Sequence, residues 1–274
     1  MKKLILYTVC LFLSFTAYSQ ITSTQNGNWS DTNTWAGGSV PGASDAVVIA
    51  HDVTCASAQG ASTLTVNNGK TLTLTKDGAL TVGTTVTNNG TIVVTGSENE
   101  SGSLIATDSN SFNLTYNLYI PASEWKLIGI PVSGLTVNDI DDNLATNGSK
   151  VGIGFYNSET AAWSVFLSSQ TTASISQTRG YEMMHASGGV VAFSGALRTS
   201  NRSTIATYAN KWALLGNPYP SYLRLSDDAN GASGTNYFLN STHLGYLKGT
   251  HQAIYGWDGS AYDVYSNSDA SGGN

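Results

Sequence analysis

The chain has 274 residues, of which 41% are hydrophobic and only 11% are charged, against about 25% charged residues in an average globular domain. This composition excludes a disordered tail, because disordered segments are rich in charge and poor in apolar residues. The 12 Lys and Arg residues against 18 Asp and Glu residues give a net charge of −6, which excludes a large basic surface for nucleic acid. The 29 glycines and 14 tyrosines are typical of a turn-rich, all-β protein.

Residues 1–19 have the pattern of a secretory signal peptide. Two lysines are followed by an apolar run and then by the small residues Ala17 and Ser19, which signal peptidase prefers before its cut. The run is shorter than the roughly 20 residues that span a bilayer, so we predict an exported protein whose mature part has no membrane span. Cleavage removes Cys10 and leaves Cys55, which we expect to be buried and unreactive.

Two tryptophans stand in the glycine-rich segment 27–54, which contains Gly-Asn-Trp-Ser-Asp, Val-Pro-Gly and His-Asp-Val-Thr. This segment resembles the cap-and-coil opening of many secreted Bacteroidetes proteins and the glycine-rich G8-type module. A stack of β-coils leaves an open end that needs a cap. We therefore expect Trp29 and Trp35 to plug a stack whose first rung is residues 46–49.

Short alternating strands follow, separated by glycine turns. Two Asn-Asn-Gly turns begin at Asn67 and Asn88, 21 residues apart. Such strands fit either hairpins or rungs of a parallel β-helix, and the recurrence near one coil length favours the β-helix. A hairpin meander stays as the alternative. The Thr-x-Thr triplets, at residues 63–65 and 85–87 for example, are expected to point outward beside different turns, which disfavours a flat ice-binding array.

Two later segments match each other and indicate a tandem duplication. The matched residues are Trp125, Gly129 and Pro131 in the first copy and Trp212, Gly216 and Pro218 in the second, each 87 positions later. Residues 154–156 and 253–255 match at a spacing of 99, so the second copy carries an insertion in a polar loop. We expect Trp212, Tyr255 and Trp257 to be core residues. The strand that ends the first copy has no counterpart before residue 274, so we expect a longer natural protein.

These patterns predict an all-β protein with a short capped parallel β-helix followed by a β-sandwich-like duplicated unit. The expected organisation is a signal peptide at residues 1–19, cap and coils at residues 20–115, and tandem repeats at residues 116–274, divided into residues 124–210 and 211–274.

The repeated phrases carry a resemblance to a known kind of protein. Trp-Lys-Leu-Ile-Gly-Ile-Pro-Val from Trp125, Trp-Ala-Leu-Leu-Gly-Asn-Pro-Tyr-Pro-Ser from Trp212 and Ala-Ile-Tyr-Gly-Trp-Asp-Gly from Ala253 resemble large flavobacterial proteins exported by the type IX secretion system. The resemblance implies the export machinery as a partner, a place on the outer surface of a Gram-negative bacterium or outside it, and a C-terminal sorting domain that this sequence does not include. It implies no particular activity, because delivery and architecture define the family.

Residues suited to metal binding are few. The four histidines, His51, His185, His243 and His251, show no metal-ligand spacing, and we expect neither a metal nor a cofactor. The segment from Asp139 begins like a calcium loop, but Leu144 and Lys150 replace the required glycine and glutamate. A short helical turn is therefore favoured there over an irregular calcium site, and Asp227 is interpreted in the same way.

Catalytic residues are equally scarce. Glu182, between Tyr181 and Met183, is the one candidate buried acid, whereas glycoside hydrolysis needs two carboxylates. The sequence therefore favours a non-catalytic exported protein that serves adhesion or presentation. The alternatives are a glycan-binding accessory region of a larger polysaccharide-degrading enzyme and, third, a catalytic β-helix.

Glycan binding needs exposed aromatic rings beside amides and carboxylates. The residues that we select for it are Tyr219, Tyr222, Tyr237, Tyr246, Trp257 and Asp258. For Trp257 this is the alternative to the favoured core position, and Tyr237 and Tyr246 are the better surface candidates. The expected partners are an extracellular polysaccharide or a cell-surface component.

Overall fold

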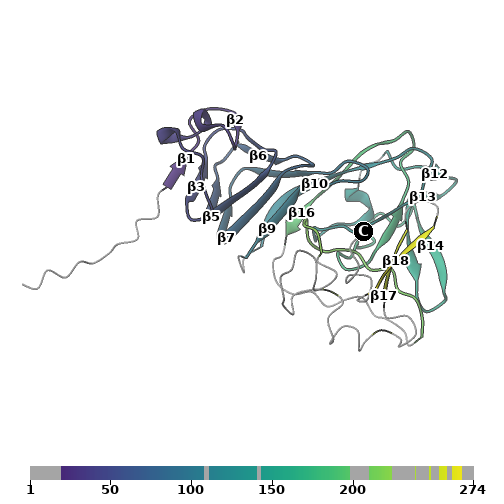
Figure 1. Cartoon of the computed structure of the whole chain (residues 1–274). Coiled ribbons are helices and arrows are strands. Elements are labelled where there is room, and N and C mark those ends of the chain that lie inside the picture. Colours follow the sequence, from purple (N-terminus) through teal and green to yellow (C-terminus); the bar gives the residue numbers. More distant parts are fainter. Residues whose placement is uncertain are drawn as a thin grey trace, which may run out of the picture.

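The computed structural model describes residues 20–107, 111–140, 143–197, 210–223, 238, 247, 253–257 and 261–266. These residues form an all-β structure in which a parallel β-solenoid of about four turns is followed by other sheets (Figure 1). The predicted fold class is therefore confirmed. The expected signal peptide at residues 1–19 lies outside the described residues.

The chain alternates between two parallel sheets as it winds through the solenoid. The first sheet holds, in order, β1 (Gln20–Thr22), β3 (Ala46–Ile49), β5 (Ala58–Val66), β7 (Ala79–Asn88) and β9 (Ser103–Ala106). The second sheet holds β2 (Gly27–Asn28), β4 (Val53–Cys55), β6 (Thr71–Leu74), β8 (Thr91–Thr95) and β10 (Phe112–Ile120). The parallel pairing excludes the hairpin meander for this segment. The first rung is β1 rather than the expected residues 46–49, because β1 pairs with β3.

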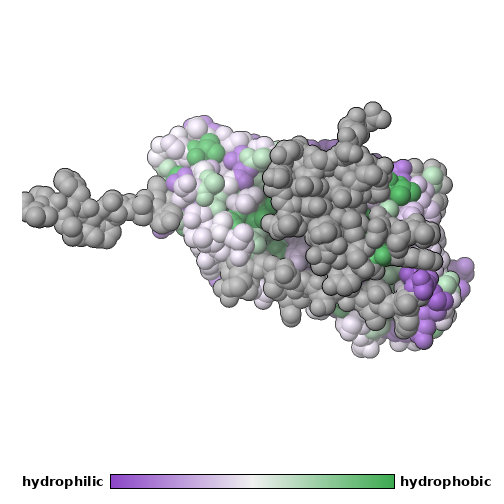
Figure 2. Space-filling view, turned by 60° about the horizontal axis from the view of Figure 1, so that its bottom comes forward, coloured by the Kyte–Doolittle hydropathy of each residue, from purple (hydrophilic) through white to green (hydrophobic). Residues whose placement is uncertain are grey.

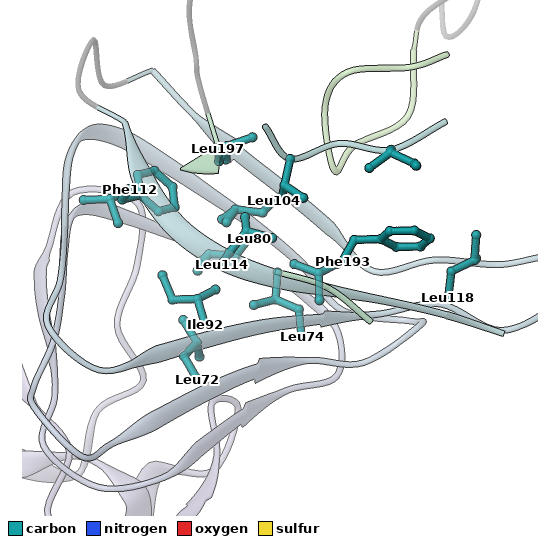
Figure 3. Close-up of a cluster of buried hydrophobic side chains, with 14 of the residues drawn as sticks. Leu72, Leu74, Leu80, Ile92, Leu104, Phe112, Leu114, Leu118, Phe193 and Leu197 are labelled. Carbon is teal, nitrogen blue, oxygen red and sulfur yellow. The ribbon is translucent and has the colours of Figure 1, made fainter. Parts of the chain in front are cut away.

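Alternate residues of each strand point into the space between the two sheets. Leu72 stacks on Ile92 and Leu74 on Val94, and all four side chains are fully buried. Figure 3 shows part of this ladder, to which both sheets contribute. Burial of each such side chain contributes about 1.5–3 kcal/mol, so the ladder is the main reason that the coils stack.

Threonines occupy outward positions of the solenoid and do stack. Thr63 pairs with Thr85 and Thr65 with Thr87 across β5 and β7. The expectation that these triplets lie beside different turns is wrong, because the register of the two strands places them rung on rung. The array is short, since β3 presents an alanine and a valine at the preceding rung.

Trp29 and Trp35 close the first coil, as expected. Their exposed fractions are 0% and 2%, and their rings meet edge to face with centroids 5.1 Å apart. Trp35 Nε1 donates a hydrogen bond of 2.6 Å to the Trp29 carbonyl oxygen. Two short 3-10 helices, η1 (Thr32–Thr34) and η2 (Ala36–Gly38), carry the chain between the two rings and back toward the first sheet.

A later strand completes the other end of the second sheet. β16 (Gly189–Leu197) pairs antiparallel with β10 along its whole length. Phe193 and Leu197 of β16 enter the solenoid core beside Leu114 (Figure 3). The second sheet therefore continues past residue 115, where the repeats were expected to begin.

The remaining strands form smaller sheets. One sheet has the order β11 (Lys126–Ile128), β15 (Tyr181–Met183), β13 (Lys150–Asn157) and β12 (Thr146–Asn147), and β14 (Ala162–Leu167) pairs with β13. β17 (Ala253–Trp257) and β18 (Tyr262–Ser266) form a separate hairpin. The hairpins β13–β14 and β17–β18 occupy the segments that match at a spacing of 99, but their registers differ, since Tyr156 pairs with Trp163 whereas Tyr255 pairs with Val264. No helix among the described residues is long and apolar enough to cross a membrane.

Candidate functional site

Both copies of the repeated phrase contact the C-terminal end of the solenoid, one at each sheet. Ser133 exchanges backbone hydrogen bonds of 2.9 and 3.1 Å with Ala196 of β16, beyond β10 in the second sheet. The amide of Leu104 on β9, the last strand of the first sheet, donates a bond of 2.7 Å to the Pro220 carbonyl. Ser133 and Pro220 are 87 residues apart and thus occupy the same position of the repeat. The duplicated unit therefore covers both sheet ends, which would otherwise expose unpaired backbone groups.

A cleft of about 240 Å³ lies at this junction. Its walls come from loop 97–102 between β8 and β9, from β10 and β11, and from segment 217–222 of the second repeat. Parts of the chain more than 100 residues apart in sequence therefore meet in one site. On the face shown in Figure 2, hydrophobic and hydrophilic residues are interspersed, and the hydrophobic ones form small separate patches.

Tyr222 connects segment 217–222 to the solenoid loop. Its hydroxyl donates to the Ser101 carbonyl oxygen at 3.0 Å and accepts from the Ser101 amide at 3.2 Å. The residue is nevertheless 70% exposed, so its ring is held at one end while its faces stay accessible to solvent. Tyr116 of β10 donates to the Ser101 side chain at 2.9 Å and supports the same loop from below the surface. Burial raises the pKa of Tyr116, so this hydroxyl stays protonated and remains a donor.

Asn217 shapes the turn that carries the second tyrosine of the cleft. Its side-chain oxygen accepts from the Tyr219 amide at 3.1 Å, and its side-chain nitrogen donates to the Ser221 carbonyl at 2.6 Å. Asparagine is favoured in such turns because its short amide replaces a backbone partner. The two prolines that flank Tyr219 in sequence restrict the backbone further. This segment therefore presents its tyrosine from a fixed backbone.

Charged groups line the cleft beside these rings. Lys126 of β11 has a buried ammonium nitrogen without a hydrogen-bond partner among the described residues. Burial lowers the pKa of Lys126, and the negative charge of Glu98 acts in the opposite direction. The neighbouring acid of the loop, Glu100, is engaged elsewhere, because Lys76 binds it at 2.6 Å.

The structure brings together some of the residues selected from the sequence. Tyr219 and Tyr222 line the cleft, and so do Gly129 and Pro131 of the first repeat. The selected residues Tyr237, Tyr246 and Asp258 and the side chain of Trp257 lie outside the described part of the chain. Lys126, Tyr116 and Ser101 were missed, because nothing in their local sequence indicates that distant strands bring them to one place.

The repeated tryptophans do not lie in the core. Trp125 is 42% exposed and Trp212 is 54% exposed, which corrects the core assignment of Trp212. The Trp212 ring instead packs edge to face on Tyr255 at the surface, with centroids 4.9 Å apart. Trp163 packs on Tyr156 in a similar way, with centroids 5.6 Å apart, although Trp163 matches Tyr262 rather than Trp212 in the repeat. Each copy therefore has an exposed tryptophan packed on a tyrosine, but the tryptophans stand at different positions of the repeat, and the buried side chains come from other residues.

The other chemical candidates have structural roles where they are described. Asp139 ends the short 3-10 helix η3 (Val137–Asp139), and its carboxylate accepts from both the amide and the hydroxyl of Thr136, as the predicted helical turn requires. His51 and Ser23 hydrogen-bond at 2.9 Å through the histidine Nδ1. In the described part of the chain, no three His, Cys, Asp or Glu side chains gather closely enough to hold a metal ion. His243, His251 and Asp227 lie outside it.

Among the carboxylates that the structure describes, Glu182 is the one whose surroundings resemble those of a catalytic acid. It lies on β15 between β11 and β13, and burial raises its pKa. It is not among the residues that line the cleft. A carboxylate with a raised pKa also occurs in purely structural positions, so Glu182 does not by itself define an active site.

Comparison with known proteins identifies a family without an assigned activity. Residues 20–267 match a domain of unknown function, DUF8693, so the chain belongs to this family. Neither the curated proteins nor the solved structures include a significant match. The functional argument therefore depends on the cleft itself.

Proposed function

We propose that the protein is an exported, non-catalytic surface protein that adheres to carbohydrate through the cleft between its solenoid and its duplicated unit. In this proposal the solenoid is a rigid scaffold, and export by the type IX secretion system of a Bacteroidetes bacterium explains the resemblance of the repeated phrases. The signal-peptide pattern of residues 1–19 supports export.

The fixed ring of Tyr222 is the observation that supports carbohydrate binding most strongly. A ring that is 70% exposed but held by two hydrogen bonds to Ser101 loses little conformational freedom when a sugar stacks on it. Tyrosine serves this purpose well, because it offers a large rigid surface with few rotatable bonds. Asn99 and Glu98 of the adjacent loop add an amide and a carboxylate for sugar hydroxyls.

A glycan array probed with the purified protein tests this proposal. We expect binding to a subset of polysaccharide fragments, and we expect Tyr222→Ala to weaken it at least tenfold. Tyr262→Ala is the matched control, because Tyr262 is a 61% exposed tyrosine on β18, outside the cleft. Absence of binding to every glycan, or equal binding by the Tyr222→Ala variant, would contradict the proposal.

The alternative is that the cleft belongs to a glycan-binding accessory region of a larger polysaccharide-degrading enzyme. The two are separated by incubating the full-length natural protein with a polysaccharide that it binds and measuring reducing ends over time. A non-catalytic adhesion protein leaves the count of reducing ends unchanged. A steady increase would favour the enzyme.

A further inference from the structure

Building on the proposed function, we infer that the cleft selects sugars that carry a carboxylate, that is uronic acids, through the ammonium group of Lys126. The proposal names a ligand class that the tyrosines alone do not specify. It depends on the position of Lys126 in the cleft wall and on the lack of a partner for its nitrogen.

The ammonium group of Lys126 lacks a hydrogen-bond partner within the described structure. A lysine has three N–H donors, and those of Lys126 have no acceptor among the described residues although the nitrogen itself is buried. A buried polar group without a partner is costly, and a charged one costs more. A carboxylate placed in the cleft would complete the site with a charge-assisted hydrogen bond, which is about twice as strong as a neutral one.

The acidic residues that the structure describes in the cleft do not form an ion pair with Lys126. Glu100 lines the cleft, but its carboxylate is paired with Lys76 at 2.6 Å. Glu98 affects Lys126 through its charge, yet the two do not form an ion pair within the described residues. Lys126 is therefore the cationic group that a ligand meets in this cleft without displacing an existing ion pair.

The size of the cleft fits one sugar ring. Its volume of about 240 Å³ is below the roughly 300–1,000 Å³ of typical drug-sized ligand sites. The fixed ring of Tyr222, in segment 217–222, offers a stacking surface in the same cleft. A single uronic acid residue would thus stack on Tyr222 and direct its carboxylate to Lys126.

The negative charge of the whole chain does not prevent this contact. The net charge of −6 repels an acidic polymer at long range. At physiological ionic strength that repulsion is screened beyond about 8 Å, whereas a contact inside a cleft is screened much less. The preference for a carboxylate therefore depends on the nearby charge of Lys126 rather than on the net charge of the chain.

Two sugars that differ only at one carbon test the inference. Methyl β-glucuronide carries a carboxylate where methyl β-glucoside carries a hydroxymethyl group, and both are titrated into the purified protein by NMR. We expect the glucuronide to bind at least tenfold more tightly. Lys126→Met should abolish that preference, Lys126→Arg should retain most of it, and Lys150→Met, which changes an exposed lysine of β13, should leave it intact.

The outcomes separate this inference from the proposed function. Equal affinity for the two sugars, or a preference that survives in Lys126→Met, would overturn the role of Lys126 while carbohydrate binding stands. Binding of neutral glycans alone on the array would have the same consequence. Failure to bind any glycan would overturn both.

Discussion

Gly129 and Gly216, which occupy the same position in the two repeats, lie against each other in the fold. A Cβ atom on Gly216 would lie 3.2 Å from the Gly129 Cα and 2.5 Å from the Arg179 carbonyl oxygen. A Cβ atom on Gly129 would lie 2.6 Å from the Asn217 nitrogen. Both positions are therefore restricted to glycine by close approach of backbone atoms, and the contact joins the two repeats beside the cleft.

Gly216→Ala is expected to destabilise the protein by about 1–3 kcal/mol, because backbone atoms rather than flexible side chains must move to admit the methyl group. Urea unfolding of the variant and of Gly83→Ala measures the difference. Gly83 is the control, since its nearest neighbour would lie at 3.8 Å, an ordinary contact. A free energy of unfolding for Gly216→Ala within about 0.5 kcal/mol of wild type would show that the repeats do not meet as described.

Trp29→Ala is expected to open the N-terminal end of the solenoid. The side chain is fully buried against Trp35, and removal of a buried tryptophan costs about 3–5 kcal/mol. Hydrogen exchange should accelerate first in β1 and β3, which form the rungs beside the cap. The matched control is Trp163→Ala, because Trp163 is 46% exposed and should cost much less. Equal losses in the two variants would contradict the capping role.

The solenoid could be predicted from the sequence because its signals are local. Alternation of Leu72 and Leu74 with threonines marks a strand, and the recurrence of Asn-Asn-Gly marks the coil. The strand that completes the end of the stack could not be predicted. β16 pairs with β10 although about 70 residues separate them along the chain, and nothing in the sequence of β16 indicates this partner. The cleft depends on another long-range contact, that of Tyr222 with Ser101, so Lys126 was missed for the same reason.

The tryptophan assignment failed for a different reason. The prediction of a core position for Trp212 depends on its positional repeat, and tryptophan is highly buried on average. Repetition of a residue does not place it inside the fold, however, and the Trp212 ring packs on Tyr255 at the surface. The repetition of a residue indicates that its position is constrained, but it does not indicate whether the side chain faces the core or the surface.

Glu182→Gln is expected to change the dependence of stability on pH. Burial raises the pKa of Glu182 above its ordinary value of 4.5, so the folded state binds this proton more tightly than the unfolded state. The group therefore favours folding below its unfolded pKa, and that contribution is lost as the pH rises through the raised folded value. Glutamine does not ionise, so the variant does not lose stability in this way as the pH rises. We therefore expect its free energy of unfolding to match that of wild type at pH 3 and to be at least as high at pH 7.

Urea unfolding at both pH values checks this expectation, with Glu124→Gln as an exposed control. A glutamine variant clearly less stable than wild type at pH 7 would mean that the Glu182 carboxylate has a stabilising partner. That result would reopen the case for a functional acid on β15.

Cys55 is expected to be unreactive while the protein is folded. Its side chain is fully buried in the solenoid, and burial raises the thiol pKa, so the reactive thiolate is scarce. Titration of the secreted protein with a thiol reagent should give no reaction in buffer and one thiol per chain in urea. Two thiols in urea would show that Cys10 is still present and that residues 1–19 had not been removed. Rapid reaction in buffer would instead contradict the burial of Cys55, because the reagent would need access between the two sheets.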